Sequence, residues 1–275
     1  MTPGDPGAAL QSGSKDWPIS FSTHDALAVP VPTRSEQATV LDAGFMYSGL
    51  MTPQPSQHAQ LLHSLALVHR ALRRSLNSII QVSEQPVPEH DRGDFADFIE
   101  RFTKFLHSHH DGEEEVIFPS LRAAAERVSM RDLLAHLASW QAAHETLLSR
   151  LQQLEGASKS FRANGAQEAL ARAALEVKDL LFSHLDAEEA ALSEAVLLQL
   201  MSAEQAAALS QSASKHGQQH GGPMVLMMYL HGLTDAEQSH FSTMPWFVRR
   251  VLMKRVWARG FRGSLKYAHN PSIAV

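Results

Sequence analysis

Apolar residues recur at steps of three and four along four long segments in the middle of the chain. In the first segment, the recurring positions are Leu61, Leu62, Leu65, Val68, Leu72, Leu76 and Ile79. This period places the apolar side chains on one face of a helix. The segment therefore predicts an amphipathic helix that begins near Gln57 and ends before Pro86, since proline has no amide hydrogen with which to continue it.

Three further segments repeat this period. In order, they cover about residues 94–116, 130–154 and 166–192. Pro119 is expected to mark the exit of the second helix, and Ser129 can cap the start of the third. Residues 156–165, which begin and end with glycine, are expected to connect the third helix to the fourth. Because no long segment alternates as a strand does, the chain is predicted to be all-α, with an antiparallel up-down four-helix bundle.

The predicted bundle has an extension on each side. Residues 1–55 are rich in Gly, Pro, Ser and Thr and show no helical period, so we expect them to form an irregular N-terminal arm. We assign the bundle to residues 56–200 and a C-terminal helical extension to residues 201–275. The chain is therefore predicted to have one core domain with two additions.

Three shorter helices are expected in the C-terminal extension. Ser202 can cap one that ends near Lys215, and Thr234 with Glu237 has the spacing of a capping box for a second. The third, at about residues 245–259, is basic and amphipathic, and no acidic residue follows Glu237. We expect it to pack against the bundle with its charges in water, or to make weak contact with an anionic membrane surface.

The composition limits the classes of function. The chain has 275 residues, 44% of them apolar, and a formal net charge of −5 with histidine neutral, so nucleic-acid binding is not expected. The absence of cysteine excludes a disulfide scaffold, a thiolate zinc site and a cysteine-ligated iron–sulfur cluster. Charged residues interrupt the first positions and no apolar run is long enough to span a membrane, so we expect a cytoplasmic location.

Two of the predicted helices carry the same His-x-x-x-Glu spacing. His109 is followed by Glu113 in the second helix, and His184 is followed by Glu188 in the fourth. Residues at this spacing lie on one face of a helix, a single turn apart. A metal ion can therefore take an imidazole nitrogen and a carboxylate oxygen from one helix, and the carboxylate can reach a second ion.

The other two helices each place a histidine on their apolar side. His69 shares a stripe with Leu65, and His144 shares one with Leu147. Together the helices would direct four histidines and two glutamates inward, which favours a two-metal centre. Mixed imidazole and carboxylate ligands suit iron or manganese, and also zinc.

Residues adjacent to the assigned ligands offer an alternative register. His110 and Glu114 repeat the His-x-x-x-Glu spacing, and Glu189 directly follows Glu188, so these residues stay open as alternatives. Apart from the ligands, four solvated acids are expected near the site, where they can orient imidazoles as hydrogen-bond acceptors, namely Glu114, Glu115, Asp186 and Asp111.

Taken together, the motifs resemble those of the hemerythrin-like, HHE cation-binding family. The residues that carry the resemblance are His69, His109-His110-x-x-Glu113-Glu114-x-x-Ile117-Phe118-Pro119, His144-Glu145 and His184-x-x-x-Glu188-Glu189. The resemblance implies a non-haem di-iron centre with a bridging oxygen. It also implies a ligand set in which both glutamates are bridges, namely His69, His109, Glu113, His144, His184 and Glu188.

The resemblance also bears on the register and on one missing ligand. In the family, the proline of the Phe-Pro tail follows the ligand glutamate by six positions, which selects Glu113 over Glu114. Oxygen-carrying members have two histidines four residues apart on the third helix, whereas here Trp140 stands four residues before His144. One imidazole is therefore missing, and the centre is expected to be richer in carboxylate.

The missing imidazole implies a role in reacting with a small molecule more than in carrying it. We expect hydrogen peroxide, dioxygen or nitric oxide as the ligand, with an unidentified electron donor. Manganese or zinc in place of iron, and a non-enzymatic oxygen or iron sensor or store, are the alternatives. The residues do not choose between binding and turnover as an oxidoreductase.

A further histidine pair lies in the C-terminal extension. His216 and His220 have the spacing of two ligands on one helix. Gly217, Gly221 and Gly222 indicate that the helix ends at this point, which argues against a second metal site there.

Overall fold

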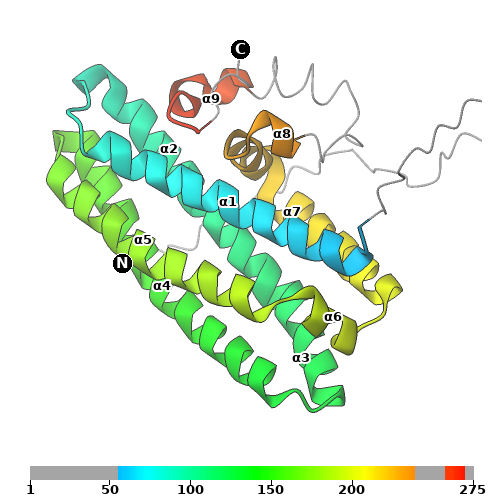
Figure 1. Cartoon of the computed structure of the whole chain (residues 1–275). Coiled ribbons are helices and arrows are strands. Elements are labelled where there is room, and N and C mark those ends of the chain that lie inside the picture. Colours follow the sequence, from blue (N-terminus) through cyan, green and yellow to red (C-terminus); the bar gives the residue numbers. More distant parts are fainter. Residues whose placement is uncertain (1–54, 239–257, 270–275) are drawn as a thin grey trace, which may run out of the picture. The chain divides into compact units, whose positions relative to one another are not determined.

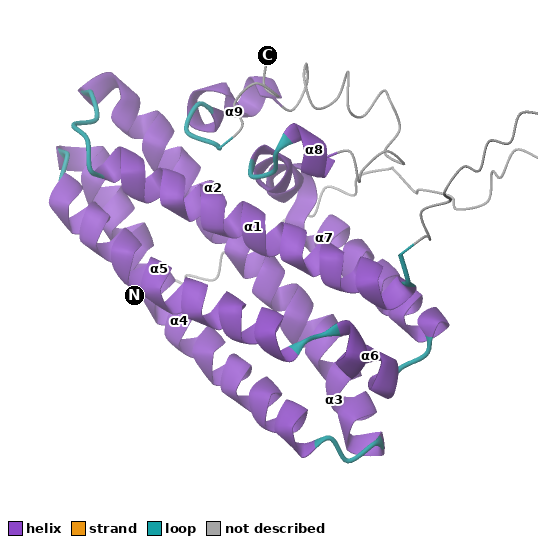
Figure 2. Ribbon diagram, viewed as in Figure 1, coloured by secondary structure: helices purple, strands orange, loops and turns teal. Residues whose placement is uncertain are grey.

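The computed structural model describes residues 55–238 and 258–269, and every regular element in them is helical (Figures 1 and 2). The predicted all-α class is confirmed. The predicted arm at residues 1–55 lies outside the described residues apart from its last position. The basic helix predicted at residues 245–259 lies outside them apart from its last two positions.

From α1 to α8 the elements follow one another with short connections. In chain order they are α1 (Gln57–Ser83), η1 (Glu89–Asp91), α2 (Arg92–Gly112), η2 (Glu113–Ile117), α3 (Phe118–Arg127), α4 (Arg131–Asn164), α5 (Gln167–Ala191), α6 (Glu194–Leu200), α7 (Ala203–His231), α8 (Asp235–Gln238) and α9 (Ala258–Leu265). The first and fourth predicted helices agree with α1 and α5 to within about two residues at each end.

α1 begins where a serine caps it. Ser56 Oγ accepts a hydrogen bond of 3.0 Å from the amide of Ala59, which satisfies one of the amides that lack a partner in the first turn. Next to it, the buried His58 imidazole lies 2.9 Å from the carbonyl oxygen of Met201. The contact of His58 holds the start of α1 against the turn between α6 and α7.

The long helices α1, α2, α4 and α5 enclose the main hydrophobic core (Figure 1). α4 packs along α5, α1 along α5, and α2 along α4. The core joins the apolar stripes of all four, including Leu72, Leu76, Phe95, Phe98, Phe102, Leu151 and Leu181. Burying a side chain of this size contributes about 1.5–3 kcal/mol, so the stripes drive the assembly. Among the described residues, no helix is long and apolar enough to cross a membrane.

The prediction that Pro119 ends the second helix was wrong. α2 is followed directly by η2, a π-helical turn, and then by α3. Pro119 falls in the first turn of α3, where its missing amide hydrogen and fixed φ are tolerated. The wider turn inserts an extra residue between α2 and α3, so each keeps its own buried face.

The connection predicted at residues 156–165 was also wrong. Gly156 lies inside α4, which continues to Asn164. The chain turns only at Gly165, whose φ of 75° is in the left-handed region that glycine adopts at little cost. Ser129 does not cap α4, because it has a φ of 57° and Met130 precedes the first helical residue.

α7 is much longer than the helix predicted after Ser202. Ser202 and Gln205 form a capping box, as the start of the helix requires. The helix does not end near Lys215 but continues to His231, with a break at Gly222, which has a φ of 62°. Gly222 supplies the positive φ, and the proline after it begins the second half of α7.

The second half of α7 joins the bundle. Met227, Met228 and Leu230 are buried in the same core as α1 and α2, and α7 packs along both helices. The end of α7 is in direct contact with α1 at Gly232, the residue that follows the helix. The C-terminal extension and the predicted bundle therefore share one hydrophobic core in the described residues.

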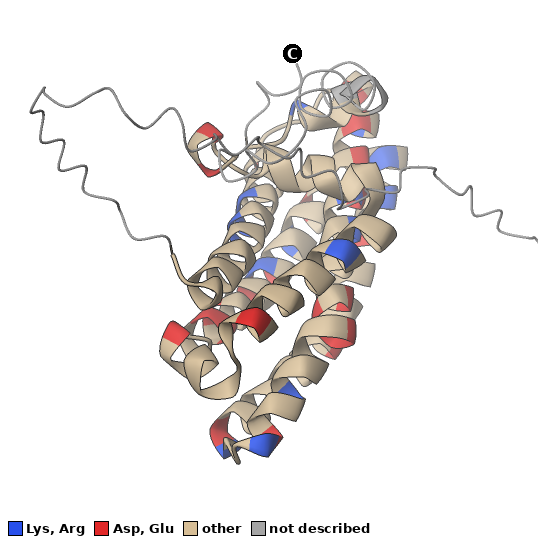
Figure 3. Cartoon of the chain, turned by 90° about the vertical axis from the view of Figure 1, so that its right-hand side faces the viewer, with Lys and Arg blue, Asp and Glu red and all other residues tan. Residues whose placement is uncertain are grey.

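Polar contacts attach the last described elements to the bundle. Basic and acidic positions are interspersed over the described helices (Figure 3). The predicted capping box at the start of α8 is present, with the Thr234 amide donating to Glu237 at 2.9 Å. Lys266, just after α9, lies 2.6 Å from Asp91, and Arg101 of α2 lies over the ring of Phe261. Exposed pairs of this kind contribute little singly, so the buried face of α9 carries most of its attachment.

The contact at Gly232 gives a testable prediction about stability. A Cβ added at residue 232 would lie 2.7 Å from Ala71 Cβ and 2.8 Å from Ala71 Cα, so Gly232→Ala should push α7 and α1 apart. Overpacking of this kind costs about 1–3 kcal/mol of unfolding free energy. Urea unfolding of the metal-free protein, followed by circular dichroism, measures the loss.

Gly156→Ala is the matched control. Gly156 is exposed inside α4, and an added Cβ would meet nothing within 4 Å. Alanine there should raise the unfolding free energy by about 0.5–1 kcal/mol, because glycine is a poor helix former. A Gly232→Ala variant as stable as Gly156→Ala would contradict the close contact between α7 and α1.

Candidate metal centre

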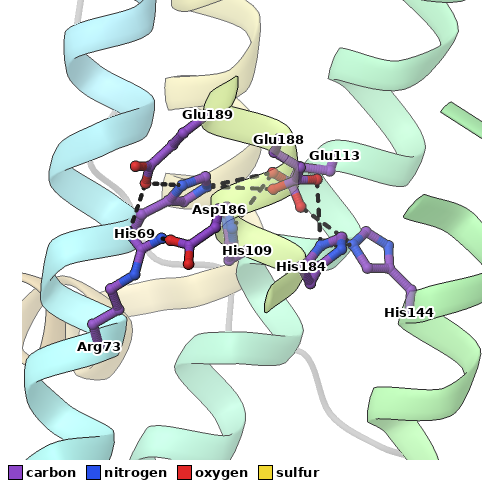
Figure 4. Close-up of polar contacts among 9 residues, drawn as sticks. All are labelled: His69, Arg73, His109, Glu113, His144, His184, Asp186, Glu188 and Glu189. Atoms are coloured by element: carbon purple, nitrogen blue, oxygen red, sulfur yellow. Dashed lines mark hydrogen bonds and ion pairs between the residues drawn. The ribbon is translucent and has the colours of Figure 1, made fainter. Parts of the chain in front are cut away.

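Side chains from α1, α2, η2, α4 and α5 converge at one point inside the bundle (Figure 4). All six sequence-predicted ligands are there, and one further histidine, His110, joins them. In chain order the seven are His69, His109, His110, Glu113, His144, His184 and Glu188. The site lies in the interior, since His69, Glu113 and Glu188 are each exposed by 1% or less.

The possible ligand atoms form two groups that share Glu113. The first group consists of His110, Glu113, His144 and His184, and the second of His69, His109, Glu113 and Glu188. In each group the ligand atoms lie within 4.8 Å of one another. Bonds of about 2.0–2.2 Å place opposite ligands of one ion about 4 Å apart, so each group has the dimensions of one metal position.

Each of the two carboxylates faces both groups. Glu113 Oε1 lies 3.4 Å from His109 Nε2, while its Oε2 lies 3.5 Å from His144 Nε2. Glu188 Oε2 lies 3.6 Å from His69 Nε2, while its Oε1 lies 3.3 Å from His184 Nε2. Figure 4 shows the two carboxylates between His69 on one side and His144 and His184 on the other. Both glutamates are therefore oriented to bridge two positions.

The unpaired polar atoms of the centre test whether metal ions fit. The Nε2 atoms of His69, His109 and His110, one oxygen of Glu113 and both oxygens of Glu188 are buried without a hydrogen-bond partner. A buried polar group without a partner costs about 1–3 kcal/mol, and charged groups cost more. These atoms surround the two positions of the ligand groups, so the donor set fits two cations.

Burial shifts the carboxyl and imidazole groups in opposite directions. Desolvation, with the charge of Glu188 adding to it, raises the pKa of Glu113 well above its usual range, and desolvation raises the pKa of Glu188 to about 8. Desolvation also lowers the pKa of His109 and His110 well below the usual value and that of His184 to about 3. The imidazoles are therefore held neutral, which is the form that binds a metal ion.

A glutamate outside each ligand group orients one imidazole. The Nδ1 of His144 donates to Glu114 at 2.8 Å, and the Nδ1 of His69 donates to Glu189 at 2.8 Å. A proton on Nδ1 leaves Nε2 with its lone pair toward the centre. Glu114 and Glu189 are each the second residue of a Glu-Glu pair whose first residue lies in the centre.

Hydrogen bonds connect each orienting glutamate to an arginine, directly for Glu189 and through Gln141 for Glu114. Glu189 accepts from Arg73 at 2.7 Å, and Arg73 also lies 2.5 Å from Asp186 (Figure 4). On the other side, the amide of Gln141 donates to Glu114 at 2.7 Å and accepts from Arg122 at 2.6 Å. The hydrogen bond from His69, with Arg73 adding to it, lowers the pKa of Glu189 to about 2, so this carboxylate is ionised.

The structure shows which of the alternative residues face the centre, which their spacing alone left open. Glu114 lies outside both ligand groups, whereas His110 lies in the first. Glu188 faces the centre, and Glu189 faces the Nδ1 side of His69. The reasoning from spacing missed that His109 and His110 both point inward. The signal for it was that His110 stands three residues before Glu113, a spacing that shares one side of a helix as the four-residue spacing of His109 does.

The remaining histidines named from the sequence lie apart from the centre. His216 Nδ1 lies 3.7 Å from Glu115, and its ring is 4.2 Å from that of the exposed His220. Neither histidine belongs to a group of three close ligands in the part of the chain that the structure describes. The helix continues through Gly217 and Gly221 and breaks at Gly222, so the predicted end of the helix is confirmed at Gly222 alone.

A small surface pocket adjoins the centre on the side of α1 and α5. It has a volume of about 180 Å³ and is lined by Leu62, Leu65, Ala66, Leu192 and Glu189. Because Glu189 is hydrogen-bonded to His69, the pocket approaches the second ligand group. A larger pocket of about 440 Å³ lies between α3 and α7, and none of the seven residues of the centre lines it.

The fold and the site define a helical cation-binding domain. The sequence model of the hemerythrin HHE cation binding domain matches residues 60–196, a span that holds all seven residues of the centre. The chain therefore belongs to this family through that domain, and the resemblance seen in its motifs is confirmed. No curated protein and no solved structure gives a significant match to the chain.

The orienting glutamates generate a second prediction. Glu114→Gln and Glu189→Gln should each weaken metal binding about 10–100-fold, because a neutral amide no longer favours the Nδ1–H tautomer of His144 or His69. Competition with a chromophoric chelator measures the affinity. Glu115→Gln is the control, since Glu115 is exposed and belongs to neither ligand group. Equal affinities in all three variants would contradict an orienting role.

The pKa shifts generate a third prediction. Metal binding must displace the protons of Glu113 and Glu188, so the affinity should rise from pH 6 to about 8, by about tenfold per pH unit for each proton released. The neutral imidazoles add little to this dependence. Calorimetric titration in two buffers with different heats of ionisation counts the protons.

The metal-free protein should show the opposite dependence. A carboxyl group whose pKa is raised to about 8 stabilises the fold while it is protonated, and this contribution is lost as the pH rises through that value. The melting temperature of the chelated protein should therefore fall between about pH 6.5 and 8, above the range where the histidines of the unfolded chain titrate. A metal affinity independent of pH would contradict protonated carboxyl groups in the metal-free centre.

Proposed function

We propose that the chain is a non-haem di-iron protein that binds, and reacts with, a small oxidant at this centre. The observation that carries the proposal is the orientation of Glu113 and Glu188, each of which faces both ligand groups. We also propose that α1, α2, α4 and α5 run as an antiparallel up-down bundle around it. In this proposal the hydrophobic core positions the helices, and the two carboxylates join them at the centre.

The chemistry of the donors favours iron. Imidazole nitrogen and carboxylate oxygen together suit iron and manganese, with zinc as a further candidate, and the chain has no cysteine to select a softer ion. When bound, a pair of iron ions would supply Lewis acidity and electrons. The protein's own part is to hold neutral imidazoles and two shared carboxylates in a site that excludes bulk water.

The surroundings of the centre favour a small ligand. All seven residues of the centre are buried or nearly so, and the adjoining pocket of about 180 Å³ is mainly apolar. A volume of this size has room for a few water-sized molecules. Hydrogen peroxide, dioxygen and nitric oxide fit this restriction, whereas a larger organic substrate does not.

The test of the proposal begins with metal content. The full chain from iron-supplemented cells should bind about two iron ions, one for each ligand group, and its oxidised form should show the optical bands of oxo-bridged iron. His109→Ala and His184→Ala remove a ligand from different groups and should lower both the iron content and the melting temperature. A ligand present at 1,000 times its dissociation constant stabilises by about 4 kcal/mol, so the loss should be large.

The matched control is His90→Ala, whose imidazole is 82% exposed. It should keep the iron content and melting temperature of the wild type. After complete chelation, the differences between wild type and variants should largely disappear, because they arise from bound metal. If the melting temperatures of the chelated variants differ from that of the chelated wild type by as much as before chelation, the histidines act through packing instead.

The reaction with peroxide separates turnover from binding. Fast loss of added peroxide with gas evolution, abolished in His184→Ala, would support an oxidoreductase. A stable adduct with dioxygen that reverses under vacuum, without loss of peroxide, would instead support a sensor or store. A colourless wild-type protein without iron would contradict both functions.

A further inference from the structure

One histidine of the centre was not among the six ligands predicted from sequence. His110 is buried at the end of α2, with 7% of its surface exposed. Its ring is stacked on that of His144, with the centroids 4.0 Å apart and the planes 19° from parallel. It also meets the ring of His184 edge-on at 5.7 Å. The imidazole is therefore held among the ligands of the first group, away from solvent.

The imidazole of His110 has a buried nitrogen without a partner. Its Nε2 atom makes no hydrogen bond, and a ring nitrogen of His110 lies within 4.8 Å of the ligand atoms of Glu113, His144 and His184. A core histidine that only fills space normally pairs both ring nitrogens, because a buried unpaired nitrogen costs about 1–3 kcal/mol. Here the unpaired nitrogen is in the place where an ion in the first group would receive a ligand.

The helix geometry explains how two neighbouring histidines reach one centre. His109 stands four residues before Glu113 and His110 three, so both lie on the same side of the turn as that glutamate. The π turn that begins at Glu113 then shifts the following residues, and Phe118 is buried against His144, with ring centroids 5.5 Å apart. α2 therefore delivers His110 to the first group while α3 still buries its own apolar face.

α4 offers only one imidazole to the same group. One turn before His144, the position on that face is taken by Trp140, which is 2% exposed and packs on Phe118. The indole belongs to a hydrophobic cluster and contributes no metal ligand. Without His110 the first group would have two imidazoles, from His144 and His184, and the shared carboxylates.

We propose that His110 is a metal ligand that completes a three-imidazole position with His144 and His184, in place of an imidazole that α4 does not supply at residue 140. The centre then has five histidines and two glutamates, divided as three imidazoles in the first group and two in the second. This inference rests on the proposed function in one respect, namely that the centre binds two ions. It is independent of which oxidant reacts there.

The test measures metal content and the optical spectrum of the full chain, with no need for activity. His110→Phe keeps an aromatic ring stacked on His144 and removes the nitrogen. It should bind about one iron ion where the wild type binds about two, and the oxo-bridged bands should be lost. His107→Phe is the control, because His107 lies one turn earlier on α2 and belongs to neither ligand group. Circular dichroism and urea unfolding of the chelated proteins establish that each variant folds.

A second variant tests whether a histidine at residue 140 can take the place of His110. In the double variant His110→Ala/Trp140→His, a histidine stands one turn before His144, and the iron content should return toward two per chain. Return of the second ion together with the oxo-bridged bands would support the exchange of ligands. A folded double variant that stays at one ion would overturn the statement that His110 replaces a ligand from α4.

The outcomes separate this inference from the proposed function. If the wild type binds two ions and His110→Phe also binds two with an unchanged spectrum, His110 is not a ligand, and the di-iron proposal stands without it. If the wild type binds no metal, the di-iron proposal itself is wrong and the inference falls with it.

Discussion

The stability of the bundle depends on how the charges of two neighbouring buried carboxylates are compensated. Glu113 and Glu188 are almost fully buried, and three of the imidazoles around them, those of His69, His109 and His110, have an Nε2 atom without a hydrogen-bond partner. An uncompensated carboxylate in such surroundings costs several kcal/mol, a large share of the 5–15 kcal/mol by which a typical domain is stable. Protonation relieves part of this cost, and bound cations would relieve more of it. The candidate metal centre therefore bears on the stability of the domain as well as on cation binding.

The same constraint accounts for the two Glu-Glu pairs. In each pair the first glutamate faces the centre, and the second crosses to a histidine on a different helix, Glu114 to His144 and Glu189 to His69. One short segment thus supplies a carboxylate of the candidate centre and fixes the tautomer of an imidazole from another helix. Arg73 donates directly to Glu189, and Arg122 donates to the Gln141 amide that in turn donates to Glu114, so the polar connections run from the buried site toward the surface on both sides.

The π turn at Glu113 allows α2 to direct its histidines to the centre while α3 buries its apolar face. A continuous α-helix has one register, which would direct either the ligands of α2 or the apolar residues of α3 to the interior. The extra residue of the turn lets His109, His110 and Glu113 face the centre while Phe118 packs against His144. Trp140 fills the neighbouring space on α4 with an apolar ring.

The sequence by itself determined the helical class, the extents of α1 and α5, and six of the seven residues that converge at the candidate centre. These features are local, because a repeat of three and four residues and a His-x-x-x-Glu spacing each define one face of one helix. The tertiary structure decided what local spacing leaves open: that Pro119 and Gly156 continue helices, that Glu114 and Glu189 turn to histidines of other helices, and that His110 faces inward. Those outcomes depend on which surfaces meet across the core. A spacing within one helix says which residues share a face, and only packing against another helix decides what that face contacts.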